Sequence, residues 1–420
     1  MQQVEWLAAW VPDEGATRGR ELFSRTFDGE SDGVWSAPGR VNVIGEHTDY
    51  NAGLCLPTAL PHRTYVALRR RADDMVKLAS AQTDEQWTAS LADVAPGAVS
   101  GWGAYVAGVA WALREAGYPV GGFEATVDSC VPFGASLSSS AALECATAAA
   151  LDATFELGLM DSVDGRRVLI AACIRAENEI AGAATGGLDH AAALLCQPGH
   201  ALALDFRPGL PPDEFAQLTP FDLAAAGLTL LVIDSRAPHQ LVDGQYAARR
   251  ASCEQAAELL GVSSLREVPI DGLLTASEVL FDAVPNEAEA KLLCRRMRHV
   301  VTEIARTAEF IALVRTGLGS DGVPNEAAVT RAGELMNASH DSLRDDYEVT
   351  VRETDLAVEA SRAAGAIGAR MTGGGFGGST IALVRAGEVD AVAAAVHAAF
   401  VDAGLTAPGF LLAPPSAAAF

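Results

Sequence analysis

One segment, residues 37–53, constrains the fold and the function of this chain more than any other. Its sequence is A-P-G-R-V-N-V-I-G-E-H-T-D-Y-N-A-G. It places charged and amide side chains among glycines, with Val41, Val43 and Ile44 as its main apolar anchors. A solvated loop would not need those anchors, and a core strand would not carry so many polar groups. The pattern predicts a short strand running into a loop whose side chains converge on a small polar ligand. Because a carboxylate can accept from two neighbouring hydroxyl groups, we infer that this ligand is a sugar.

The size and charge of the chain limit its architecture and its partners. A chain of 420 residues can bury a large core and is long enough for two domains. The net charge of −24 repels nucleic acid and anionic membranes, so we exclude both as partners. The only lysines are Lys77 and Lys291, and neither lies in a G-x-x-x-x-G-K-[ST] loop, which excludes a P-loop kinase. An anionic nucleotide would have to be held by arginines and backbone N–H groups.

Cysteine usage and hydropathy indicate the compartment. The seven cysteines are scattered and form no C-x-x-C pair, which favours reduced thiols over a disulfide framework or a zinc site. The first residues, M-Q-Q-V-E-W, show no basic region leading to an apolar stretch, and no apolar run reaches the length of a membrane span. We therefore expect a cytoplasmic protein.

Strands and helices are mixed along the chain rather than strictly alternating, which favours an α+β fold over a doubly wound sheet. A stretch rich in proline and polar residues at 208–220 is the best candidate for a domain junction, and we divide the chain into domains 1–207 and 208–420. The expected strands are 64–70, 123–128, 201–206, 228–234, 366–372 and 379–385. The expected helices are 141–151, 166–180, 245–260, 287–306, 326–342 and 389–403.

Residues 131–143, V-P-F-G-A-S-L-S-S-S-A-A-L, have the composition of a phosphate-binding loop. Small residues and three consecutive serines run directly into an alanine-rich helix. The first N–H groups of a helix have no internal partner and lie in positive potential, and small residues let a phosphate approach them. The alternative, which is the commoner one for such a segment alone, is a serine N-cap before an ordinary helix.

A glycine run at residues 370–379, R-M-T-G-G-G-F-G-G-S, satisfies G-x-G-x-x-G through Gly373, Gly375 and Gly378. A dinucleotide fingerprint needs a following helix whose N-terminus meets the pyrophosphate. Here residues 380–384 are mostly apolar and β-branched, so a strand is expected instead. We therefore interpret the run as a strand–strand connection rather than a Rossmann motif.

Taken together, the three motifs resemble those of galactokinases, members of the GHMP small-molecule kinase superfamily, and they occur in the order found there. The resemblance covers nearly the whole chain. It implies a two-domain GHMP kinase fold, with a ribosomal-protein-S5-like N-terminal domain, a ferredoxin-like C-terminal domain and the active site in the cleft between them. It also implies Mg²⁺- and ATP-dependent phosphorylation of galactose at its anomeric hydroxyl, which yields galactose 1-phosphate and ADP.

The resemblance carries residue roles onto this sequence. Asp189 matches the catalytic base, with Arg40 beside it, and Ser140 and Glu177 match the magnesium ligands. An N-cap for Asp189 and a structural Arg–Asp pair for Arg40 are the alternatives. The matching sugar contacts are Glu46, His47, Asp49, Gly186 and Tyr246, although Tyr246 alone would read as core. The matching nucleotide loop comprises Gly134, Ala135, Ser136, Leu137, Ser138, Ser139 and Ser140.

Several positions depart from the resembled pattern. Ser136 stands where glycine is usual, His190 where glutamine is usual, and Ile304 where asparagine is usual. Arg352 and Thr354 interrupt a segment that usually reads P-E-L-D. These changes leave two alternatives open: another sugar 1-kinase, acting on N-acetylgalactosamine, galacturonate or arabinose, and a galactose- and ATP-binding sensor without turnover. We expect the protein to be a monomer. The candidate residues for the adenine pocket are Trp87, Trp102 and Tyr105.

Overall fold

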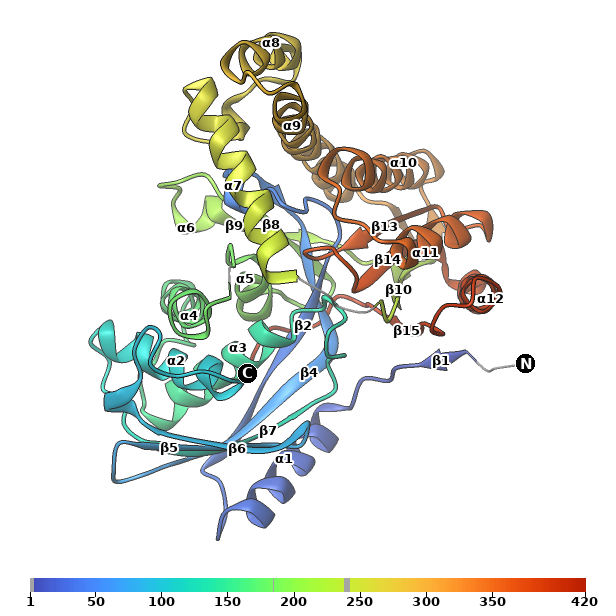
Figure 1. Cartoon of the computed structure of the whole chain (residues 1–420). Helices are drawn as coiled ribbons and strands as arrows, with labels where there is room; N and C mark the ends of the chain where they lie inside the picture. Colours follow the sequence, from blue (N-terminus) through green and yellow to red (C-terminus); the bar gives the residue numbers. More distant parts are fainter. Residues whose placement is uncertain (1–3, 184, 238–241) are drawn as a thin grey trace.

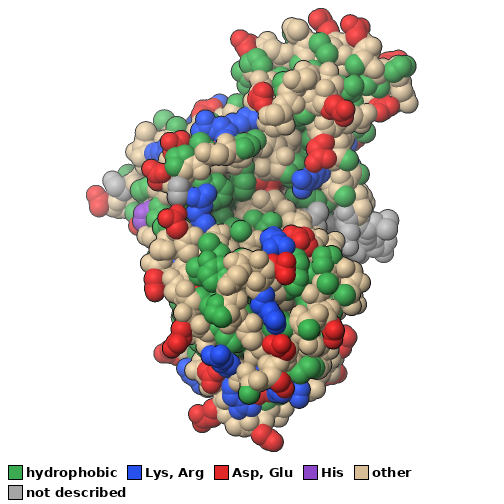
Figure 2. Space-filling view, turned by 90° about the vertical axis from the view of Figure 1, so that its left-hand side faces the viewer, with side chains coloured by type: hydrophobic (Ala, Val, Ile, Leu, Met, Phe, Trp, Pro, Cys, Tyr) green, Lys and Arg blue, Asp and Glu red, His purple; other side chains and the backbone are tan. Residues whose placement is uncertain are grey.

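The computed structural model describes residues 4–183, 185–237 and 242–420, and two five-stranded sheets organise it (Figure 1). The space-filling view shows one face hollowed between a larger lower part and a smaller upper part (Figure 2). Within the described residues, no helix has the length and apolar character needed to cross a bilayer.

The first sheet has the strand order β2-β4-β7-β5-β6, with β5 and β7 parallel and the other neighbours antiparallel. Helix α1 (Pro12–Thr26) packs on one face, and helices α3 and α5 pack on the other with α2 and α4 against them (Figure 1). Alanines line much of α3, so it is buried on nearly all sides. The strands are β2 (Gly33–Asn42), β4 (Pro57–Arg70), β5 (Met75–Ser80), β6 (Thr83–Ser90) and β7 (Phe123–Ser129). The helices are α2 (Gly103–Glu115), α3 (Ser139–Thr154), α4 (Val163–Arg175) and α5 (Leu188–Leu195).

The second sheet has the order β1-β15-β10-β14-β13 and carries helices on both faces. Along β10, Leu230 and Val232 pack with α9 and α10, whereas Leu231 and Ile233 pack with α11 and α12. Burial on both faces explains the continuous apolar sequence of this strand. The strands are β1 (Glu5–Trp6), β10 (Leu228–Asp234), β13 (Gly368–Thr372), β14 (Ser379–Arg385) and β15 (Gly409–Leu412). The helices are α9 (Glu287–Thr316), α10 (Glu326–Ser342), α11 (Arg352–Ala363) and α12 (Val389–Asp402).

The remaining elements connect these two layers. Helices α7 (Val242–Leu260) and α8 (Leu273–Ala283) pack with α9 in the upper part of the molecule (Figure 1). A three-stranded sheet is formed by β3 (Leu54–Cys55), β8 (His200–Asp205) and β9 (Ala216–Pro220), and a small hairpin by β11 (Gly319–Ser320) and β12 (Val323–Pro324). Short helical turns lie at η1 (Asp49–Asn51), α6 (Pro212–Phe215), η3 (Ala176–Ala181) and η7 (Leu343–Tyr347).

The α+β prediction is confirmed, as are all six expected strands and all six expected helices, with shifted ends. Helix α9 is longer than expected, because its second half buries Phe310, Ile311 and Val314. The stretch at 208–220 contains α6 and β9, and β9 pairs with β8 across the predicted domain division. The division at 207/208 stays a prediction. All seven cysteines are free thiols.

Each end of the chain packs with the sheet of the other predicted domain. Strand β1 pairs with β15 in the second sheet, and the last residues return to the first sheet. There, Phe420 exchanges two backbone hydrogen bonds with Ser36 on β2, and the N–H of Ala419 donates to the carbonyl of Ala193 on α5. The C-terminal segment therefore holds together β2 and α5, the two elements that carry Arg40 and Asp189.

Arg63 on β4 anchors this segment from inside the protein. Its guanidinium donates to the hydroxyl and carbonyl of Ser36 and to the carbonyls of Ala417 and Ala418, at 2.8 to 3.0 Å. The ring of Phe420 lies 4.3 Å from the guanidinium carbon. Burial lowers the pKa of Arg63 to about 10, and in the described residues no carboxylate forms an ion pair with it. Neutral acceptors alone therefore hold this buried cation.

Replacing Arg63 by methionine keeps the apolar stem but leaves several buried acceptors without a donor. We expect Arg63→Met to lower the free energy of unfolding by about 3 kcal/mol in urea titrations. Arg20→Met, at an exposed position of α1, is the matched control and should change stability by less than about 0.5 kcal/mol. Equal losses in both variants would contradict the anchoring role.

Candidate active site

Arg40 lies near the end of β2, where the pairing with β4 shifts register between Pro38 and Arg40. Its Nε and Nη2 contact Oδ1 of Asp189 at 2.8 and 2.7 Å, and its Nη1 donates to the carbonyl oxygen of Ser136 at 2.7 Å. The Arg40 side chain is 8% exposed and that of Asp189 is 24% exposed. The arginine is therefore fixed, while part of the carboxylate surface stays open to a ligand.

Asp189 is the second residue of α5, which begins after Gly187 in the left-handed region at φ 95°. Gly187 occupies the N-cap position, so the alternative that Asp189 is an N-cap is wrong. The Ser138 hydroxyl donates to Oδ2 of Asp189 at 2.6 Å, and Arg40 holds Oδ1. Each carboxylate oxygen is thus held by a different residue, which sets the orientation of the group.

The loop before α3 contains three residues with positive φ angles. Gly134, Ser136 and Ser138 have φ values of 72°, 57° and 60°, all in the left-handed region. Ser138 occupies the N-cap position of α3, but its hydroxyl is engaged with Asp189 and caps no N–H group. A serine thus stands at the N-cap, as the alternative had it, but it makes no capping hydrogen bond, and the first turn of α3 keeps N–H groups suited to an anion.

The glycine run packs directly on this loop. A Cβ added at Gly378 would overlap the Ser136 hydroxyl, and one added at Gly373 would come within 2.9 Å of the Ser136 Cβ. The Ser379 hydroxyl donates to the carbonyl of Ala135 at 2.7 Å. Strand β14 follows the run, which confirms the strand–strand interpretation. Glycine is therefore required here for close approach of the two loops.

Ser140 and Glu177 lie together behind the phosphate loop. Glu177 is on η3, a π-helical turn that continues α4, and the Ser140 hydroxyl hydrogen-bonds to its carboxylate. Burial, and after it the charge of the nearby Glu144, raise the pKa of Glu177 to about 7. A hydroxyl and a carboxylate are hard oxygen ligands, so the pair fits the chemistry of Mg²⁺.

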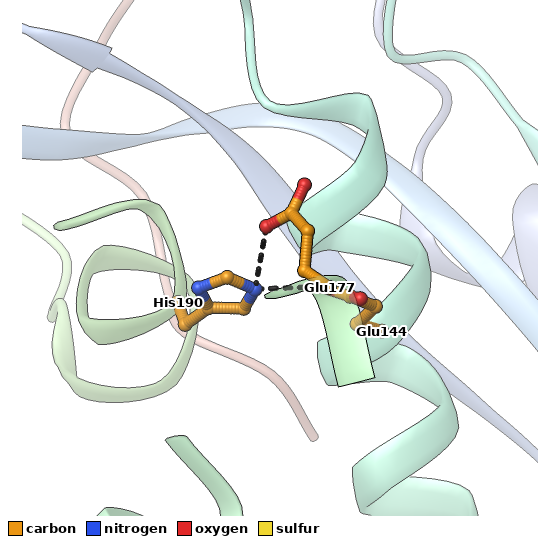
Figure 3. A group of neighbouring side chains, drawn as sticks. All are labelled: Glu144, Glu177 and His190. Atoms are coloured by element: carbon orange, nitrogen blue, oxygen red, sulfur yellow. Dashed lines mark hydrogen bonds and ion pairs between the residues drawn. The ribbon is translucent and has the colours of Figure 1, made fainter. Parts of the chain in front are cut away.

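His190 and Glu144 complete this region (Figure 3). The His190 Nε2 lies 2.6 Å from a Glu144 carboxylate oxygen and 3.4 Å from one of Glu177. The side chains of His190 and Glu144 are 0% exposed. Our sequence analysis did not select Glu144, although an acidic residue among the alanines in the first half of an alanine-rich helix was the available signal.

Asp49 and Gly186 meet on the side where the sugar was expected. A Cβ at Gly186 would overlap Oδ2 of Asp49, so only glycine fits that position. Burial, with a smaller contribution from the charge of Asp189, raises the pKa of Asp49 to about 6. The Tyr246 ring on α7 lies 5.5 Å from the ring of His47, and both Asp49 and Asp189 act on its hydroxyl electrostatically. Four of the five expected sugar contacts thus form two neighbouring pairs, and Asp189 acts electrostatically on one member of each pair.

His47 belongs to an aromatic group that sequence reasoning did not reveal. Its Nδ1 lies 2.9 Å from the Tyr50 hydroxyl, which is 2.7 Å from the Tyr347 hydroxyl. Burial lowers the pKa of His47 to about 3, so the ring is neutral. Its Nε2 has no hydrogen-bond partner in the described part of the chain. That nitrogen is therefore the polar atom of His47 that a ligand could engage.

Glu46 points away from this group toward the second sheet. Its Oε1 accepts from the Thr372 hydroxyl at 3.2 Å and from the Gly373 N–H at 2.9 Å, and its Oε2 pairs with Arg370. Burial raises the pKa of Glu46, while Arg370 opposes the shift. Both oxygens are occupied by partners on β13 and the glycine run. A sugar contact for Glu46 stays a prediction, and Arg370, buried at 0% exposure, was missed by sequence reasoning.

The expected adenine-pocket residues lie on β6 and around the start of α2. Trp87 Nε1 donates to the carbonyl of Ser100 at 3.0 Å, and Trp102 Nε1 donates to that of Glu85 at 3.3 Å. The ring of Trp87 covers Gly103, where a Cβ would overlap it. The adenine pocket itself stays a prediction.

The left-handed backbone at Ser136 predicts a measurable strain. Holding an L residue in the left-handed region costs about 1–2 kcal/mol. Glycine avoids this cost, but it loses more backbone entropy on folding, which cancels part of the gain in stability. We expect Ser136→Gly to raise the free energy of unfolding by about 0.5–1 kcal/mol in thermal and urea unfolding. Ser138→Gly, at nearly the same φ of 60°, is the matched control and should bring no gain, because it removes the hydrogen bond to Asp189.

The shifted pKa of Asp49 predicts how stability depends on pH. The unfolded chain releases this proton near pH 4, and the folded protein releases it near pH 6. Between these values the folded protein binds more protons, so its stability falls as the pH rises. Asparagine has no such proton. The stability of Asp49→Asn relative to the parent should therefore increase by about 1 kcal/mol between pH 5 and pH 7 and stay level above. Asp84→Asn, at an exposed position, should show no such trend.

Comparison with known proteins agrees with this geometry. Three family models match: the galactokinase galactose-binding signature at residues 21–70, the GHMP kinase N-terminal domain at 104–197 and the GHMP kinase C-terminal domain at 325–402. The galactokinase of Streptomyces coelicolor is 47% identical over 95% of this chain and 96% of its own. That of Bos taurus is 40% identical over 88% of each chain.

Solved structures give the same result. The crystal structure of Lactococcus lactis galactokinase complexed with galactose matches with a TM-score of 0.84 at 31% identity, covering 96% of this chain and 98% of that one. The Methanococcus jannaschii mevalonate kinase, at 14% identity and a TM-score of 0.59, covers 93% of this chain and 100% of its own, and shows the shared fold alone. The predicted GHMP kinase fold is thereby confirmed, and the chain belongs to the galactokinase family.

Proposed function

We propose that this sugar kinase transfers the γ-phosphoryl group of ATP to the anomeric hydroxyl of galactose, yielding galactose 1-phosphate and ADP. The observation that carries the proposal is the carboxylate of Asp189, held by Arg40 and Ser138 between an uncapped helix N-terminus and Asp49. Membership of the galactokinase family, at 47% identity to one relative, supports the substrate.

The nucleotide site follows from the phosphate loop. The first-turn N–H groups of α3 and the serine hydroxyls would donate to phosphate oxygens, which replaces the lysine that a P-loop kinase uses. The glycine run covers this loop from β13, so the phosphates would lie between two segments without bulky side chains. The residues proposed for phosphate binding are Gly134, Ala135, Ser136, Leu137, Ser138, Ser139 and Ser140.

Ser140 and Glu177 are proposed to hold Mg²⁺, because they present a hydroxyl and a carboxylate that already touch. When bound, the ion supplies charge neutralisation on the β- and γ-phosphates. The protein residues supply the alignment: the π-helical turn fixes Glu177, and the first turn of α3 fixes Ser140.

Asp189 is proposed to orient the anomeric hydroxyl and to accept its proton on a carboxylate oxygen. Phosphoryl transfer passes through a loose transition state, so positioning and charge stabilisation provide most of the rate enhancement. Arg40 would act twice, since it fixes Asp189 and offers positive charge to the transferring group. The base itself would contribute about 10²–10⁴-fold.

The sugar is proposed to lie against Asp49, Gly186, Tyr246 and His47. Gly186 leaves room for Oδ2 of Asp49, and the unpaired Nε2 of His47 offers a polar contact to a hydroxyl. Glu46, with both oxygens engaged, would act by holding the glycine run in place. The intact Asp189–Arg40 pair argues against a sensor without turnover. A monomeric, cytoplasmic enzyme is proposed as well, on the free cysteines and the high net charge.

The role of the base can be tested by removing its charge. Asp189→Asn should lower kcat by about 10²-fold or more, with the affinity for a non-hydrolysable ATP analogue nearly unchanged. Asp164→Asn, an exposed aspartate in the first turn of α4, controls for helix-terminus effects and should retain kcat. Near-native kcat in Asp189→Asn would refute the assignment.

The substrate can be tested with a coupled ADP-release assay over a panel of sugars. Galactose should give a kcat/KM far above those of glucose and N-acetylgalactosamine. A site built to pair a hydroxyl can reject analogues that leave its polar groups unpaired by about 10⁴-fold. Equal kcat/KM for galactose and glucose would refute galactose as the specific substrate and would support only the broader assignment as a sugar kinase.

A further inference from the structure

Three buried side chains behind the phosphate loop come from three different helical elements. Glu144 is on α3, Glu177 on η3 and His190 on α5, and both carboxylates point at the His190 ring (Figure 3). The candidate ligand atoms of the three residues lie within 4.8 Å of one another. Only Glu177 has a proposed role in the transfer reaction.

The polar atoms of this group are not all paired within the protein. In the described residues, neither Glu144 nor Glu177 forms an ion pair with any lysine or arginine, and the imidazole of His190 is their shared partner. One oxygen of Glu144 and the Nδ1 of His190 are buried without any hydrogen-bond partner. A buried carboxyl group is normally neutralised by a proton, by a paired cation or by a metal ion, and burial raises the pKa of Glu144 well above its ordinary range. A bound divalent cation would use the polar atoms that the protein leaves without a partner.

We infer that Glu144, Glu177 and His190 form a binding site for a divalent first-row transition-metal cation, separate from the nucleotide-linked magnesium. Such ions bind imidazole nitrogen and carboxylate oxygen together, whereas Mg²⁺ prefers oxygen ligands alone. Metal–ligand bonds of about 2.0–2.2 Å place two ligand atoms on a common ion about 3–3.5 Å apart. For the three residues to surround one ion, the hydrogen bond of 2.6 Å between His190 and Glu144 would have to open, whereas the 3.4 Å separation between His190 and Glu177 already fits.

Glu177 lies between the two proposed cation sites and would contribute to both. Its carboxylate faces Ser140 on the side of the phosphate loop and His190 on the side of the core. An ion on the core side would fix the Glu177 carboxylate and join α3, η3 and α5, so that the magnesium ligand and the helix of Asp189 share one rigid support. The inference does not rest on the proposed function, because neither nucleotide nor sugar is needed to occupy the site.

The test uses the full chain, stripped of metal with a chelator and free of nucleotide and sugar. Mn²⁺ is titrated in, and free Mn²⁺ is followed by electron paramagnetic resonance to give stoichiometry and affinity. Electron spin-echo modulation of the bound ion then reports whether a nitrogen ligand is present. His190→Gln and Glu144→Gln are compared with the parent, and His200→Gln, on β8 outside the group, is the matched control.

We expect one bound Mn²⁺ per chain with nitrogen modulation in the parent and in His200→Gln. His190→Gln should lose the modulation, and both site variants should bind about tenfold or more weakly. Bound Mn²⁺ without nitrogen modulation in the parent would overturn the inference, and this measurement needs no variant to fold. Modulation that persists in His190→Gln would assign the nitrogen to another residue and would equally overturn it.

Discussion

The ion pair between Arg40 and Asp189 is the interaction around which the candidate site is arranged. It joins β2 to α5 across a separation of 149 residues, and the same arginine holds the phosphate loop through the carbonyl of Ser136. Ser138 completes the arrangement by donating to Asp189 instead of capping α3. One serine thus both orients the carboxylate and leaves the helix N-terminus open, which explains how a chain almost without lysine can offer an anion site.

A second buried pair fixes the glycine run relative to the first sheet. Arg370 on β13 pairs with Glu46 after β2, and Glu46 also accepts from the N–H of Gly373. Burying such charges costs free energy unless their hydrogen bonds are satisfied, and a broken pair leaves an uncompensated buried charge. Here those hydrogen bonds are made, because Arg370 also donates to the carbonyls of Asn42 and Val43 and Glu46 accepts from the Gly373 N–H. Gly373 and Gly378 in turn allow the glycine run to approach Ser136 closely.

Local sequence information was sufficient for the elements, whereas the roles of the site residues that it selected stay a proposal. The spacing of apolar residues predicted the strands of both sheets and the helices that pack on them. Burial of one face of an element requires apolar residues at regular intervals, and burial of both faces requires a continuous apolar run. The chemistry of Asp189, Glu177 and Asp49 was carried by short motifs whose neighbours in sequence are also neighbours in space. The N-cap alternative for Asp189 was wrong, and the serine at the N-cap of α3 forms no capping hydrogen bond, because its hydroxyl meets Asp189 only in the folded protein.

The sequence by itself determined the fold class, the family and the inventory of reacting groups. Only the tertiary structure decided that Glu46 serves the glycine run, that Ser136 is held at φ 57°, and that Glu144 faces His190. The physical reason is distance along the chain: the contact between Glu46 and Gly373 spans 327 residues, and no local pattern encodes which buried partner a carboxylate will find. Local propensity selects the elements, whereas burial and charge pairing between distant segments select what each polar group does.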